Sequence, residues 1–181
     1  IIHRDLKPAN VLVRAHDGEP LIADFGLARF RDQSSSLTIA GALIGTPAYM
    51  APEGFAGTMS PSLDVYGLGA ILYQCLTGQA PFREANLATL IHKVTRGLCE
   101  PTCAPGAPHE LELVRARAMA AKVADRYLTA GELAIDLDRV VEGAPIAQST
   151  VRHADRAKRR VRLGVLLATT AVLGGLATGV A

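Results

Sequence analysis

The first ten residues, Ile1 to Asn10, constrain the possible fold more than any other stretch of the chain. Within six positions they place a carboxylate (Asp5), a cation (Lys7) and an amide (Asn10). Pro8 lies among them and prevents a regular helix from holding the set. We therefore predict a rigid loop held between buried apolar segments. An acid that takes a hydroxyl proton, a cation that balances growing charge and an amide ligand for a metal are the groups that phosphoryl transfer requires.

A β-hairpin is predicted directly after this loop. Residues 11–14 and 21–23 are suited to short strands, and an Asp-Gly pair in the connection between them is a strong hairpin signal. Such a hairpin returns the chain towards Asn10 and brings Asp24 near it. A carboxylate and an amide oxygen at one strand end can share a hard cation such as Mg²⁺.

These motifs together resemble the catalytic loop and the metal-binding Asp-Phe-Gly tripeptide of protein kinases. The resemblance implies that Asp5 is the catalytic base, or the acceptor that orients a substrate hydroxyl. It implies that Lys7 stabilises the transferring phosphoryl group, and that Asn10 and Asp24 hold Mg²⁺ together with ATP. Lys7, Asn10 and Asp24 are accordingly the expected cofactor-binding residues. The lysine two positions after the base resembles the serine/threonine class, so the expected substrate is a protein serine or threonine hydroxyl.

Residues 27–50 occupy the position of the kinase activation segment. They lack helical or strand periodicity, which favours a long functional loop. In kinases controlled by phosphorylation of this segment an arginine lies beside the base, as Arg4 does here, and a phosphate on the segment can pair with it. The candidate phosphorylation sites are Ser34, Ser35, Ser36 and Thr38. A solvated loop without modification is the alternative.

Residues 45–53 resemble the substrate-facing end of that segment in serine/threonine kinases. By this resemblance Thr46 contacts the catalytic loop and counts among the catalytic residues. Glu53 is expected to be buried and to pair with Arg126, far along the chain. This pair has a structural role, because removing one partner of a buried ion pair leaves an unpaired charge.

Residues 64–78 are apolar almost all round, which predicts a helix that is buried on most sides and ends near Gly78. This segment resembles the central helix of the C-terminal kinase lobe. The resemblance implies that the Asp64 side chain bonds the backbone around His3 and Arg4 and so supports the catalytic loop. A simple helix cap is the alternative role for Asp64.

Further helices are predicted at residues 84–95, 110–121 and 129–143, the last of them opened by a capping box. The expected fold is therefore mostly α with a small β-hairpin. It corresponds to the C-terminal lobe of a protein kinase over residues 1–143, with the N-terminal lobe absent. We expect the sequence to be a fragment of a longer protein, truncated at both ends.

The composition changes after this lobe. Residues 144–162 are expected to form a basic juxtamembrane linker, with six Lys or Arg and one Asp from position 152 onwards. Residues 163–181 carry no charge, and as a helix these 19 residues would span roughly 28 Å, close to the hydrocarbon core of a bilayer. A single transmembrane helix, truncated at the chain end, is therefore predicted. The basic flank predicts a cytoplasmic kinase domain at the cell membrane. A soluble Ala/Gly-rich helix or tail is the alternative.

Charge and cysteine content narrow the expected partners. The net charge is +2, and without the basic segment the body is slightly acidic, which gives no electrostatic footprint for nucleic acid. The three cysteines suggest no disulfide framework. Cys99 and Cys103 have the spacing of half a metal site, but no second pair accompanies them, so structural thiols are favoured. Glycines at positions 175 and 179 allow a possible dimer through the membrane helix.

The function expected from these motifs is that of a membrane-anchored serine/threonine protein kinase using ATP and Mg²⁺. A pseudokinase scaffold is the first alternative, although the catalytic residues expected in this stretch are all present. A kinase-like enzyme for small molecules is the second, although residues 45–53 resemble a peptide-substrate platform. Residues 1–181 contain neither the glycine-rich loop nor the strand lysine of an N-terminal lobe, so we expect them to be inactive alone.

Overall fold

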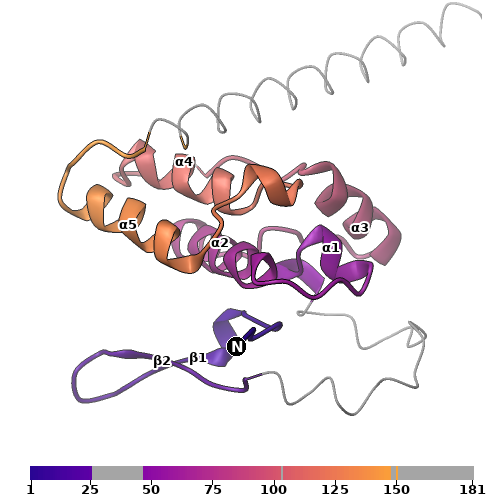
Figure 1. Ribbon diagram of the computed structural model, residues 1–181, viewed down its shortest axis with the longest axis horizontal. Coiled ribbons are helices and arrows are strands. Elements are labelled where there is room, and N and C mark those ends of the chain that lie inside the picture. Colours follow the sequence, from indigo (N-terminus) through magenta and orange to yellow (C-terminus); the bar gives the residue numbers. More distant parts are fainter. Residues whose placement is uncertain (26–46, 103, 148–149, 151–181) are drawn as a thin grey trace, which may run out of the picture.

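The computed structural model describes residues 1–25, 47–102, 104–147 and 150 of the 181-residue chain. A group of helices forms the main body, and a small hairpin that follows the N-terminus lies to one side of it (Figure 1). The elements are the helices α1 (Pro52–Phe55), α2 (Ser62–Thr77), α3 (Leu87–Arg96), α4 (His109–Ala118) and α5 (Ala130–Val141), the strands β1 (Val11–Val13) and β2 (Pro20–Ile22), and the short 3₁₀ turns Pro8–Asn10, Pro47–Tyr49 and Val123–Asp125. A mainly helical fold with a small hairpin is therefore confirmed.

Helix α2 passes through the centre of the body and is buried on two sides. On one side Tyr66, Ala70 and Tyr73 belong to an apolar cluster that includes residues of α3. On the other side Val65 belongs to a second cluster, with residues of α4 and α5. A helix that is apolar almost all round must be covered on most sides, which is why α2 lies in the middle. Gly78 follows the helix with φ 72°, a conformation that favours glycine, so the predicted stop is confirmed.

Strands β1 and β2 pair in antiparallel fashion, with Val11 opposite Ile22. The pairing continues one step beyond the strands, because the Ala23 N–H donates to the Asn10 carbonyl at 2.9 Å. The predicted hairpin is thus confirmed, with a second strand that starts one residue earlier than expected. This register carries the chain back to the end of the opening loop, next to Asp24.

Three helix boundaries are set by contacts at their ends. Helix α3 starts three residues later than predicted, because the Asn86 side-chain oxygen accepts the N–H of Ala88 and caps the helix there. Helix α4 ends at Ala118, three residues earlier than predicted. Helix α5 follows its predicted cap, since the Thr129 hydroxyl oxygen accepts the N–H of Glu132 at 3.1 Å.

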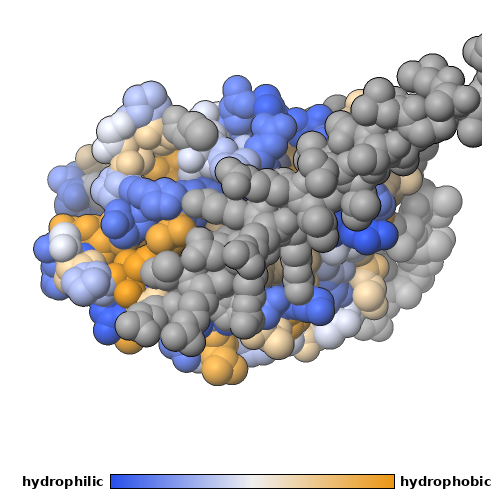
Figure 2. Space-filling model, turned by 90° about the horizontal axis from the view of Figure 1, so that it is seen from above, coloured by the Kyte–Doolittle hydropathy of each residue, from blue (hydrophilic) through white to orange (hydrophobic). Residues whose placement is uncertain are grey.

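The surface has the mixed character of a folded domain. On the face shown in Figure 2, hydrophilic residues prevail, and hydrophobic residues gather mainly in one area on the left. Within the described ranges, no helix is long and apolar enough to cross a bilayer. The predicted transmembrane segment, residues 163–181, and the basic residues from 152 to 162 lie outside those ranges.

Candidate active site

The opening loop brings its acid, cation and amide together at one carboxylate oxygen. Lys7 Nζ lies 2.7 Å from Asp5 Oδ2. The Asn10 amide nitrogen donates to the Asp5 carbonyl at 2.7 Å and to Asp5 Oδ2 at 3.3 Å. Asn10 is buried in the 3₁₀ turn that begins at Pro8. The loop therefore holds the three groups in contact without a regular helix, as the sequence predicts.

Asp64 fixes the start of this loop from the first turn of α2. Its two carboxylate oxygens accept the backbone N–H groups of His3 and Arg4, each at 2.8 Å. Arg4 has φ 75°, a left-handed conformation that costs a residue with a side chain roughly 1–3 kcal/mol. Two charge-assisted hydrogen bonds can offset such a cost. The contact inferred from the kinase resemblance is present, and the capping alternative is wrong, because Pro61 occupies the cap position.

We expect Asp64→Asn to destabilise the protein by about 1.5–3 kcal/mol, because one charge-assisted hydrogen bond is lost and an amide N–H₂ then faces a backbone donor. Urea unfolding of the full-length protein measures this change. Asp138→Asn is the matched control, since Asp138 is exposed on α5 and its change should stay within about 0.5 kcal/mol. A loss for Asp64→Asn no larger than that of the control would contradict the anchoring role.

A close approach between the loop and α2 depends on Gly67. A Cβ atom at this position would lie 2.8 Å from the Leu6 Cβ and 3.2 Å from the Leu6 carbonyl oxygen. Leu6 itself is buried. The glycine therefore allows the backbone of the opening loop to pack directly against α2, next to its contact with Asp64.

His3 joins the loop to the segment after the hairpin, a role that the sequence analysis missed. The ring is buried, its Nε2 lies 2.8 Å from the Ala23 carbonyl oxygen, and its Nδ1 accepts the Asp5 N–H at 3.3 Å. One neutral tautomer, with the proton on Nε2, satisfies both bonds. The Phe25 ring lies 5.0 Å from the His3 ring, centroid to centroid. The predicted burial of the residues before His3 is wrong for Ile1, which is fully exposed, and nothing in the sequence identifies Ala23 as the partner of His3.

Asp24 lies where the sequence predicts, beside the end of the opening loop. The residue before it, Ala23, bonds Asn10 through its N–H and His3 through its carbonyl. Asp24 has φ 59°, again a left-handed conformation. Because the Asn10 nitrogen donates to Asp5, the Asn10 amide oxygen is the atom suited to a cation. Carboxylate and amide oxygens are the ligands that Mg²⁺ prefers, so Asn10 and Asp24 fit such an ion chemically.

A small cleft next to Asp5 opens to solvent, and its enclosed volume is only about 20 Å³. Its walls come from the opening loop, from the segment before α1 and from α2. The lining residues are Arg4, Asp5, Leu6, Tyr49, Met50, Ala51, Gly54, Leu63 and Gly67.

The predicted ion pair between Glu53 and Arg126 is present, and it joins a buried guanidinium to a half-buried carboxylate. Arg126 Nη1 and Nη2 donate to the two Glu53 oxygens at 2.6 and 2.8 Å, and the Arg126 side chain is 0% exposed. The guanidinium also donates to the Ala120 carbonyl at 2.6 Å and lies 4.9 Å from the Tyr66 ring centre. Burial alone would raise the pKa of Glu53, but the hydrogen bonds from Arg126, Ser62 and the backbone, together with the charge of Arg126, outweigh it and lower the pKa. The pair ties α1 to the segment before α5.

Several predicted site residues lie outside the described ranges. These are Thr46, Ser34, Ser35, Ser36, Thr38 and Cys103. Burial raises the pKa of the Cys99 thiol to about 11, so this cysteine is protonated at neutral pH and suited to packing. In the part of the chain that the structure describes, no cluster of three or more His, Cys, Asp or Glu side chains could hold a metal.

Comparison with known proteins identifies the family. The protein kinase domain matches residues 1–124, and the chain belongs to the protein kinase family. It is 38% identical over 164 residues to the serine/threonine-protein kinase PknB of Mycolicibacterium smegmatis, covering 86% of this chain and 26% of the relative. It is 39% identical over 152 residues to PknB of Mycobacterium tuberculosis, covering 80% of this chain and 24% of the relative.

A third relative is also a serine/threonine-protein kinase, but it is PknH and not PknB. The chain is 39% identical over 138 residues to the serine/threonine-protein kinase PknH of Mycobacterium bovis, covering 75% of this chain and 23% of the relative. The chain thus spans about a quarter of the length of these curated relatives.

Proposed function

We propose that this chain is the C-terminal lobe of a serine/threonine protein kinase, which transfers the γ-phosphoryl group of ATP to protein hydroxyls. The observation that carries the proposal is the convergence of Lys7 and Asn10 on one oxygen of Asp5. The relatives' shared name, serine/threonine-protein kinase, supports the class of acceptor.

In the proposed reaction Asp5 receives the substrate hydroxyl. Lys7 and Asn10 both bond Oδ2, so we assign Oδ1 as the oxygen that orients the hydroxyl and accepts its proton. The Lys7 ammonium then lies beside the position where charge grows on the transferring group. Asn10 and Asp24 would hold Mg²⁺ with ATP, and the ion would neutralise phosphate charge. Thr46 is assigned to the contact between substrate platform and catalytic loop.

Control of activity is assigned to the activation segment. A phosphate on Ser34, Ser35, Ser36 or Thr38 would carry about −1.5 to −2 charges and could pair with Arg4. The exposed Arg4 lies directly beside Asp5, which supports this assignment.

Membrane anchoring is part of the same proposal. The uncharged residues 163–181 would form a single transmembrane helix, and the basic residues before it would lie on the cytoplasmic side with the kinase domain. A dimer through the glycines of that helix is compatible with this arrangement. Residues 1–181 alone are proposed to lack phosphotransfer activity, because they contain no glycine-rich phosphate-binding loop.

The metal assignment predicts the behaviour of Asp24→Asn in the full-length kinase. We expect the Mg²⁺ concentration for half-maximal phosphorylation of a Ser/Thr peptide to rise at least about tenfold, because a neutral amide replaces a charged ligand. Asp17→Asn is the control, since this exposed aspartate lies in the turn of the same hairpin. An unchanged Mg²⁺ dependence in Asp24→Asn would refute the assignment. Absence of phosphotransfer by the wild-type protein would favour the scaffold alternative.

A further inference from the structure

The segment after α5 is docked on the lobe. Ile146 is 8% exposed and joins the apolar cluster formed by α2, α4 and α5, and Thr150 is 0% exposed. A backbone bond from the Thr150 N–H to the Ala147 carbonyl at 2.9 Å gives the segment a turn of its own. Its described residues are therefore held by packing and by hydrogen bonds, in the region that composition alone marked as a linker.

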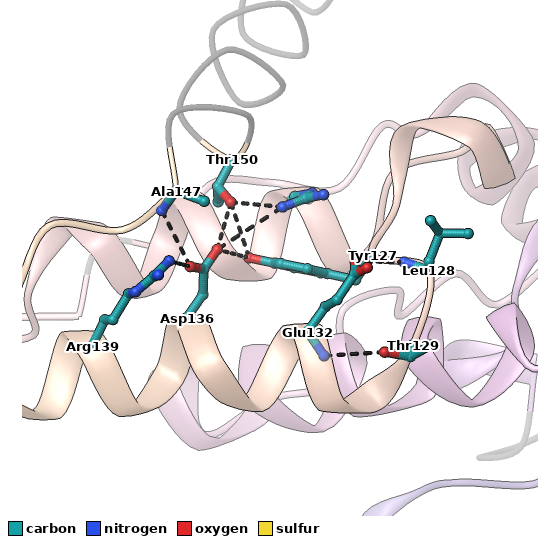
Figure 3. A network of polar contacts seen from close by, with 9 residues as sticks. Tyr127, Leu128, Thr129, Glu132, Asp136, Arg139, Ala147 and Thr150 are labelled. Carbon is teal, nitrogen blue, oxygen red and sulfur yellow. Dashed lines mark hydrogen bonds and ion pairs between the residues drawn. The ribbon is translucent and has the colours of Figure 1, made fainter.

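The buried carboxylate of Asp136 in α5 accepts the hydrogen bonds that this segment donates to the lobe (Figure 3). Asp136 is 1% exposed. Its Oδ2 accepts the Thr150 hydroxyl at 2.6 Å and the Tyr127 hydroxyl at 3.0 Å. Its Oδ1 accepts the Ala147 N–H at 3.2 Å and Arg139 Nη1 at 3.1 Å. Two of these four donors belong to the segment after α5, and two belong to the lobe.

Helix α4 contributes a positive charge near the Asp136 carboxylate, the guanidinium of Arg117. Arg117 Nη1 donates to the Thr150 hydroxyl oxygen at 2.9 Å and lies 3.9 Å from Asp136 Oδ2. The same guanidinium lies 4.0 Å from the centre of the Tyr127 ring. The Thr150 hydroxyl thus both donates to Asp136 and accepts from Arg117, so it connects α4 to α5.

The ionisation of the cluster matches this arrangement. Burial would raise the pKa of Asp136, but the hydrogen bonds from Thr150, Ala147, Tyr127 and Arg139 outweigh it and lower the pKa. Burial raises the pKa of Tyr127, so its hydroxyl keeps the proton that it donates. At neutral pH the carboxylate is charged and its donors are protonated.

Docking of this segment greatly shortens the free chain between the folded lobe and the basic residues. From Gly143 to Arg152 a free chain of nine residues would reach roughly 32 Å when extended. With Thr150 held in the lobe, the chain can carry Arg152 no further than about 7 Å from it, since only Val151 lies between the two residues. The point from which the basic segment leaves the lobe is then nearly fixed.

We propose that the segment of Ile146, Ala147 and Thr150 is a strap that belongs to the kinase lobe, is held by Asp136, and fixes the exit point of the basic segment. The strap extends the folded unit beyond residue 143. One consequence rests on the proposed function. If the segment after the strap spans a membrane, the strap sets the orientation of the lobe at the bilayer surface.

Hydrogen–deuterium exchange of the full-length protein without ATP tests the strap. In the wild type we expect protected amides at Ala147 and Thr150, which donate to Asp136 and to the Ala147 carbonyl. Thr150→Val keeps the shape and removes the hydroxyl, and should speed exchange at both amides at least about tenfold while the α5 amides keep their rates. Asp136→Asn, which removes the carboxylate charge, should do the same.

Thr95→Val is the matched control. Thr95 is exposed on α3, and its hydroxyl bonds the carbonyl of Ile91 in its own helix. Unprotected amides at Ala147 and Thr150 in the wild type would overturn the proposal, as would a Thr150→Val rate equal to that of the control. Neither measurement depends on phosphotransfer, so an inactive protein with a protected strap would refute the kinase proposal alone.

Discussion

Asp5→Asn in the full-length kinase is expected to lower kcat for a Ser/Thr peptide by about 10²–10⁴, or more. Asparagine has nearly the same shape and can still accept the Asn10 N–H, but its neutral amide cannot take a proton from a hydroxyl. Lys7 also loses the carboxylate that holds it at 2.7 Å. Steady-state phosphorylation with saturating ATP and Mg²⁺ measures the effect.

Two further measurements separate loss of chemistry from loss of fold. The Asp5 side chain is 34% exposed, so the melting temperature of Asp5→Asn should stay near that of the wild type. The Michaelis constant for ATP should change little, because the proposed metal ligands are intact. Asp17→Asn, in the hairpin turn, is the control for charge alone and should keep full activity. Near-normal phosphorylation by Asp5→Asn would refute its assignment as the base.

Arg126→Met should destabilise the protein by about 3–5 kcal/mol, the second large effect expected. Methionine fills much of the volume but leaves the Glu53 carboxylate buried without its partner, and frees the Ala120 carbonyl. For a domain of 150–250 residues this corresponds to a fall in melting temperature of roughly 6–20 °C. Thermal and urea unfolding of the full-length protein measure it.

A double-mutant cycle separates the interaction energy between Glu53 and Arg126 from the effects of the single side chains. The double variant Glu53→Gln/Arg126→Met buries no unpaired charge, so it should be more stable than Arg126→Met alone. A loss below about 1 kcal/mol in Arg126→Met, or no recovery in the double variant, would contradict the role of a buried pair.

The pH dependence of these variants follows from the direction of the Glu53 shift. In the wild type the pKa of Glu53 is lowered, so its contribution to stability is present above the unfolded value near 4.5 and is lost as the pH falls through the folded value. In Arg126→Met the unpaired, buried Glu53 should have a raised pKa. The destabilisation should therefore be largest near pH 7 and shrink as the pH falls into the range where the folded variant takes up the proton.

Patterns between neighbouring residues predicted the local elements well. Pro8 excluded a helix from the opening loop, the Asp-Gly pair marked the hairpin, and Gly78 marked the end of α2. The predicted helix ends were less accurate where a tertiary contact determines the end of the helix. Helix α4 stops at Ala118 rather than near residue 121, and the carbonyl of Ala120 is turned to the Arg126 guanidinium instead of continuing the helix.

The long-range contacts divide into two groups. The partners of Asp64 and Glu53 could be predicted because the surrounding motifs resemble a known family, not because any local pattern specifies them. The partner of His3 and the cluster around Asp136 were missed. No spacing or periodicity identifies a backbone carbonyl 20 residues away as the partner of a buried ring.

The sequence by itself determined the hairpin, the helices α2 to α5, the burial of α2 and the set of groups in the opening loop, because these depend on residues close together in the chain. Helix α1 was not predicted. Only the tertiary structure decided that Arg4 is held in a left-handed conformation by Asp64, and that Asp136 receives donors from the segment after α5. Hydrogen bonds between distant residues require a folded core that excludes water and holds both partners in place, and such a core is a property of the whole packing.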